Sequence, residues 1–186
     1  MSDSNPRRMM PRVGFRNLKT ALSTTLCAAL YLIIGRNPAF ACIGAVFGMG
    51  TDMPNSRLHG GNRFFGTIIG GLLGMGLFRL YLLIQPDGAA TWKLLPLLAV
   101  GMIVLVVISD LFWPGAVQPG GVVLSILLYK SPPDTYISYA LNRMVDTGIG
   151  VAMSLLVNYL LPRERLEAWA ARLRGQDEES LLSRDR

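Results

Sequence analysis

The sequence predicts an all-α integral membrane protein whose six transmembrane helices form two inverted three-helix repeats. Apolar residues make up 51% of its 186 residues and charged residues only 16%, whereas about a quarter of the residues in soluble domains are charged. Six segments of the chain lack charged residues, and a short motif beside the third segment recurs beside the sixth. Because a small soluble domain needs a charged surface, we expect a lipid bilayer to surround this chain.

The six uncharged segments are the predicted spans, at residues 20–35, 37–51, 64–78, 94–109, 111–129 and 147–162. Each is slightly shorter than the ~20 residues that cross a hydrocarbon core as a helix. We therefore expect flanking basic side chains, Lys19 among them, to lie at the span ends and to reach the lipid headgroups.

The spans divide the chain into three parts. We expect residues 1–16 to form a cytoplasmic basic tail and residues 17–162 to form the membrane domain, with halves at about 17–84 and 92–162. We expect residues 163–186 to form a cytoplasmic amphipathic helix followed by a mobile tail. Most of the 18 Lys and Arg residues lie in the two tails and in the loop after the second span. Positive charge accumulates on the cytoplasmic side of membrane proteins, so both termini are predicted to be cytoplasmic.

The repeat rests on a motif that occurs twice. Residues 62–70 read NRFFGTIIG and residues 142–150 read NRMVDTGIG, so Asn, Arg, Thr, Ile and Gly coincide. Each half contains three spans, an odd number, and the halves must therefore insert in opposite orientations, as in many secondary transporters. The second and fifth spans are both interrupted by Gly and Pro, which is typical of broken helices at substrate sites but equally of helix caps and tight crossings.

Ionisable and polar groups near the spans are the candidate substrate pathway, because such groups are costly in a bilayer. These candidates are Asn142, Arg143, Asp146, Asn62, Arg63, Gln118 and Asp110. Arg143 and Asn142 would offer hydrogen-bond donors to an anion, with Asp146 tuning the arginine. Alternatively, Arg143 and Asp146 pair with each other, since they are three residues apart on one helix.

The other candidates also have a structural alternative. Arg63 and Asn62 occupy the equivalent place in the first half, where anchoring to headgroups also explains an arginine. Asp110 would carry a coupling proton if it were buried, or would simply end a helix in headgroup water. His59 is predicted to lie in a solvated loop.

The third span carries Gly66, Gly70 and Gly74 at four-residue spacing, which creates a flat helix face. Small residues at this spacing allow another helix backbone to approach closely. Helix packing is therefore favoured over substrate contact, either within one subunit or across a dimer interface.

Other classes of function lack support in the sequence. The chain has one His and two Cys residues, and no nucleotide-binding, metalloprotease or serine-hydrolase motif. We expect no catalysis, no cofactor and no metal site. The basic residues flank apolar spans without interleaved aromatics, so no nucleic-acid partner is expected.

Four segments also resemble a known family: GFRNLKTALSTTLCAALYLIIG, NPAFACIGAVFGMGTDM, NRFFGTIIGGLLG and YALNRMVDTGIGVAMSLLVNYLLP. They are similar to the membrane domain of the aromatic acid exporter and fusaric acid resistance-like (FUSC) family. The resemblance implies a bacterial inner-membrane protein of six helices per domain that exports aromatic or other organic acids, with two domains working together. For this chain it implies a homodimer.

The function expected from these observations is secondary transport of small organic acid anions, aromatic ones foremost, out of the cell. Two alternatives stay open. The family's resemblance to plant malate channels allows a passive anion channel, and the glycine faces allow a membrane scaffold that transports nothing.

Overall fold

The computed structural model describes residues 14–162, 164–166, 168 and 172. The predicted basic tail and the predicted C-terminal amphipathic helix lie largely outside the described residues. The structure is helical throughout, with α1 (Phe15–Ile34), α2 (Ala39–Gly48), α3 (Met53–Ile84), α4 (Leu94–Phe112), the 3₁₀ helix η1 (Pro114–Ala116), α5 (Val117–Lys130) and α6 (Tyr136–Leu160).

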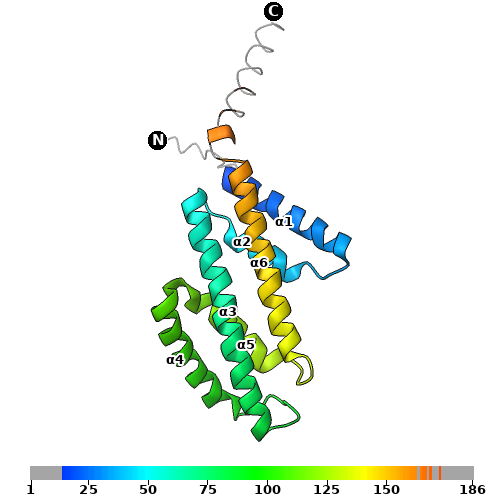
Figure 1. Cartoon of the computed structure of the whole chain (residues 1–186), viewed down its shortest axis with the longest axis vertical. Helices are drawn as coiled ribbons and strands as arrows, with labels where there is room; N and C mark the ends of the chain where they lie inside the picture. The colour runs from blue at the N-terminus through cyan, green and yellow to red at the C-terminus, as the bar shows by residue number, and fades with distance from the viewer. Residues whose placement is uncertain (1–13, 163, 167, 169–171, 173–186) are drawn as a thin grey trace, which may run out of the picture.

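The two longest helices, α3 and α6, form the centre of the molecule and run antiparallel (Figure 1). The helix α2 packs mainly against α6, while α5 packs mainly against α3. The helix α1 covers α2 and α6, and α4 covers α3 and α5. Each short helix therefore contacts most closely the long helix of the other half of the chain.

Four helices in the described part are long and apolar enough to cross a membrane: α1, α3, α4 and α6. The helix α2 has 10 residues and α5 has 14, which correspond to about 15 and 21 Å at 1.5 Å per residue. Neither reaches across a hydrocarbon core of about 30 Å. The all-helical membrane class is thus confirmed with four candidate spans, and the second and fifth predicted spans contain short helices.

Local chemistry explains why these two helices are short. The helix α2 starts after Pro38 and ends at Gly48, beyond which the backbone of Met49 is extended. Before α5, the backbone is extended at Trp113, and Pro114 then opens η1. Proline lacks a backbone donor, so it starts helices readily and interrupts them elsewhere.

The helix α3 starts earlier than the sequence predicted. The carboxylate of Asp52 accepts a hydrogen bond from the backbone N–H of Asn55 at 2.9 Å, and Pro54 lies in the first turn. Such a cap starts the helix at Met53. The same hydrogen bond holds the pKa of Asp52 below its usual value. The prediction of a loop around His59 is therefore wrong, because that residue lies within α3.

The molecule has two interior regions, which differ in chemistry. Between α3, α4 and α5 the core is apolar and includes Phe78, Leu105 and Leu124. Between α1, α3 and α6, by contrast, several buried side chains are polar. The region between α3, α4 and α5 is held mainly by apolar packing, whereas the region between α1, α3 and α6 also contains several buried polar side chains.

The polar interior includes Lys19, which is only 2% exposed. Its Nζ donates to Oδ1 of Asn158 at 2.7 Å, and Nδ2 of Asn158 donates to Oγ of Ser56 at 2.8 Å. The backbone N–H of Gly50 donates to the same Oγ at 2.8 Å. The expectation that Lys19 reaches the headgroups is wrong: its ammonium group is inside the protein, hydrogen-bonded to the end of α6.

We expect Asn158→Ala to destabilise the protein by about 1–3 kcal/mol, since it deprives a buried ammonium and a buried hydroxyl of a hydrogen-bond partner. Thermal unfolding of the detergent-solubilised protein would show a lower midpoint. Leu156→Ala is the matched control, because Leu156 lies on the same helix and is 50% exposed. Equal midpoints for the two variants would contradict the assigned role of Asn158.

Close approaches of small residues join each short helix to its long neighbour. In the contact between α6 and α2, Gly150 lies against the backbone of Ala41. In the contact between α3 and α5, Gly70 lies against the backbone of Gly120. A Cβ atom at either glycine would collide with that backbone, so only glycine permits these crossings.

Candidate functional site

Two pockets lie beside α2, and both contain residues singled out from the sequence. The first, called the Arg143 pocket, has a volume of about 340 Å³ and is lined by Arg36, Asn37, Ala39, Phe40, Tyr139, Asn142, Arg143 and Asp146. The second, called the Arg63 pocket, has a volume of about 310 Å³ and is lined by Phe47, His59, Asn62, Arg63, Gly115, Gln118, Pro119 and Val122. The pockets share no lining residue.

The guanidinium of Arg143 is held against α2. The residue is 2% exposed, and its Cζ lies 4.2 Å from the centre of the Phe40 ring. Its Nη1 donates to the hydroxyl of Tyr139 at 2.9 Å, one turn earlier on α6. Its Nε is buried and has no hydrogen-bond partner. A cation–π contact of this kind contributes stabilisation but does not neutralise the charge.

The carboxylate of Asp146 pairs with a different arginine. Its Oδ1 accepts from Nη2 of Arg36 at 2.9 Å and from the hydroxyl of Tyr31 at 2.7 Å. This is the one ion pair within the described parts of the chain. The alternative in which Arg143 pairs with Asp146 is therefore wrong, because Asp146 faces the end of α1 and the loop after it.

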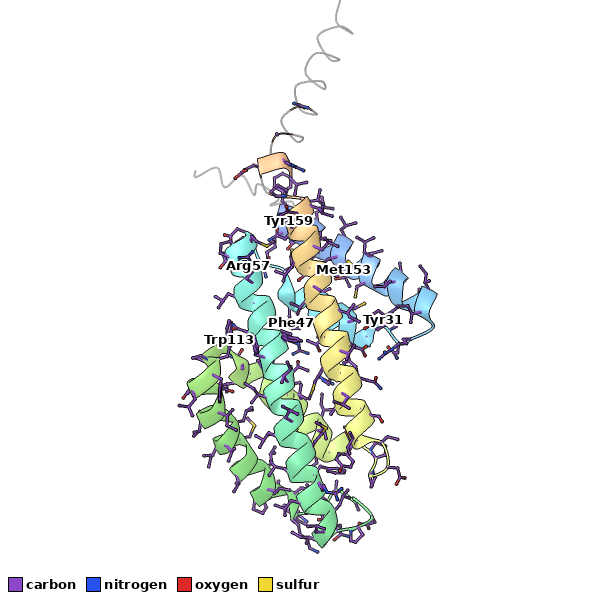
Figure 2. The ribbon with its side chains drawn as sticks, viewed as in Figure 1. Tyr31, Phe47, Arg57, Trp113, Met153 and Tyr159 are labelled. Atoms are coloured by element: carbon purple, nitrogen blue, oxygen red, sulfur yellow. The ribbon has the colours of Figure 1, made fainter. Side chains whose placement is uncertain are left out.

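The Arg63 pocket contains a similar arrangement. The Cζ of Arg63 lies 5.5 Å from the centre of the Phe47 ring, and its Nε is buried without a partner. Oδ1 of Asn62 accepts from Nε1 of Trp113 at 2.6 Å, which ties α3 to the end of α4. Figure 2 shows Phe47 near the middle of the molecule and Trp113 on the side formed by α4.

The arginines of the two pockets carry charge of the same sign. Like charges repel, and in a low-dielectric interior this repulsion is stronger than in water. Within the described residues no carboxylate forms an ion pair with either arginine. The region around α2 therefore carries uncompensated positive charge at two places.

The remaining sequence candidates lie in different surroundings. Gln118 is exposed and lines the Arg63 pocket, whereas Asp110 is exposed on α4 and lines neither pocket. Gly66 and Gly70 lie against Ala116 and Gly120, and Gly74 meets a leucine of α5. The glycine face thus contacts η1 and α5 within the same chain.

No sequence pattern predicted a role for Arg36, Tyr31 or the two phenylalanines of α2. The ion pair of Arg36 joins residues 110 positions apart, and no local pattern reports such a contact. The spacing of Phe40 and Phe47 was a usable pattern, because residues seven positions apart lie on the same face of a helix. No three His, Cys, Asp or Glu side chains cluster as a metal site would require, as far as the described residues go.

Comparison with known families places this arrangement in context. The family model described as aromatic acid exporter family member 1 matches residues 11–161, a range that contains all the helices from α1 to α6. Comparisons with curated proteins and with solved structures find no match. With four candidate spans, the protein is a multi-pass membrane protein, and the chain belongs to the aromatic acid exporter family.

Proposed function

We propose that the protein exports small organic acid anions, aromatic ones foremost, by secondary transport. The observation that carries this proposal is the buried guanidinium of Arg143, which lines a pocket and has no carboxylate partner among the described residues. A buried charge is costly unless it is paired. A substrate carboxylate entering the pocket would supply the missing partner.

The Arg143 pocket suits an organic acid in more than charge. Arginine offers planar, bidentate donors that match a carboxylate. The rings of Phe40 and Tyr139 meet edge to face beside it, with centres 5.9 Å apart and planes at 85°. An apolar or aromatic body would find contact area here, which supports an amphiphilic anion over an inorganic one.

Alternating access needs two related arrangements of the protein, and an inverted repeat can provide them. The helix packing supports such a repeat. Gly70 and Gly150 end the two copies of the motif, and each lies against a short helix of the opposite half. Four residues further on, Gly74 meets Leu127, whereas Ser154 meets Gly48. The same helix positions make the same crossings in both halves, as two inverted copies would.

The orientation belongs to the same proposal. The N-terminal end of α1 and the C-terminal end of α6 lie at the same end of the molecule (Figure 1). With the basic tails in the cytoplasm of a bacterial cell, the Arg36 end of the Arg143 pocket faces outward. The Arg63 pocket is then nearer to the cytoplasm. An exported anion would therefore reach the Arg63 pocket first and the Arg143 pocket second.

Flux through the purified protein in liposomes tests the proposal, with benzoate as the probe and with or without an imposed pH gradient. We expect saturable benzoate movement that stops when a protonophore collapses the gradient. Fast movement down the benzoate gradient, unaffected by the protonophore, would replace the exporter by a channel. If no acid of a broad carboxylate panel moves, the protein is a scaffold and the proposal fails.

A further inference from the structure

We infer that the chain binds two anions at once, one in the Arg143 pocket and one in the Arg63 pocket, at opposite ends of α2. The inference rests on the proposed function, because it takes the ligand to be an organic carboxylate. It adds the number of binding sites and their order along the path.

The two pockets repeat the same set of groups. Each has an arginine from a central helix with an asparagine before it, at the first two positions of the repeated motif. Each arginine lies over a phenylalanine of α2, and each has a buried Nε without a partner. One anion would satisfy only one of these two unpaired groups.

Helix packing places the two arginines at different levels of the central helix pair. Gly71 of α3 lies against Met144 of α6, so Arg143 is level with residues close to Gly71. From Arg63 to Gly71 is eight residues, or about 12 Å along α3 at 1.5 Å per residue. Each guanidinium lies over a different ring of α2, and a carboxylate contacts its donors within about 2.9 Å, so we assign each arginine its own carboxylate.

The short helix α2 matches this spacing. Phe40 and Phe47 are seven residues apart, which is about 10 Å along a helix and nearly two turns. Each ring therefore sits beside its own arginine, and α2 lies between the two sites. Because the two arginines carry like charge, an anion bound at one of them weakens the positive field at the other, and we expect the second anion to bind less tightly.

Equilibrium dialysis of radiolabelled benzoate against the full-length protein in detergent measures the number of sites. We expect two benzoates per chain for the wild type, one for Arg63→Gln, one for Arg143→Gln and none for the double variant. Arg79→Gln is the matched control, since Arg79 lies on α3 and is exposed. It removes the same charge and is expected to leave two sites.

The variants Arg63→Lys and Arg143→Lys cover the case in which a glutamine variant fails to fold. Each keeps the positive charge, and we expect two benzoates per chain with weaker binding at the altered site. A single benzoate on the wild type, lost in either arginine variant, would overturn the two-site inference and leave the exporter proposal intact. An absence of both benzoate binding and benzoate flux would instead count against the proposed function.

Discussion

Gly70→Leu is expected to separate α3 from α5 and to lower the stability of the protein by at least about 3 kcal/mol. A side chain at this position would collide with the backbone of Gly120, and backbone does not move aside as a flexible side chain does. Overpacking of a well-packed contact costs about 1–3 kcal/mol even where side chains give way. Thermal unfolding in detergent measures the loss.

Gly76→Leu provides the matched control for this prediction. Gly76 lies on the same helix, and a Cβ atom built there would meet nothing within 4 Å. The two variants share the same change in helix propensity and in hydrophobicity, so their difference isolates the crossing. If both unfold at the wild-type temperature, the close approach of α3 and α5 is absent in the folded protein.

Arg143→Gln is expected to reduce benzoate transport by about 10- to 100-fold, because a hydrogen bond to a charged group contributes about 1.5–3 kcal/mol. Glutamine provides a polar, uncharged side chain of similar width but removes the charge and the guanidinium group. Initial rates of benzoate uptake into liposomes, at equal amounts of reconstituted protein, measure the effect.

Two further variants sharpen this result. Arg79→Gln removes an exposed arginine from α3 and is expected to transport at the wild-type rate. Arg143→Lys keeps the charge but offers no planar pair of donors, so an intermediate rate is expected. Wild-type transport by Arg143→Gln would show that the anion is bound elsewhere.

The sequence was most informative where a pattern is local. The glycine spacing of Gly66, Gly70 and Gly74 predicted a flat helix face, and the structure supplies its neighbour, α5. Arg143 stood out because an ionisable residue beside a membrane span has few explanations. Long, strongly apolar segments such as α4 are recognised by composition alone.

The sequence failed where partners are distant along the chain. Lys19 is next to the predicted first span, and only the position of Asn158, 139 residues later, shows that its ammonium is buried. Asp146 has a basic residue three positions away, yet it pairs with Arg36 across the fold. Such choices depend on how whole helices pack, which periodicity within one helix does not encode.

The shortness of α2 has an electrical consequence. Its length is about 15 Å, roughly half of a hydrocarbon core, and water-accessible pockets flank it. If water fills both pockets, the membrane voltage would fall mainly across the short segment between them. An anion that moves from one pocket to the other crosses much of that voltage, which amounts to about 2.3 kcal/mol per charge for each 100 mV. Export of an anion towards a positive outside would then be driven in part by the resting potential of the cell.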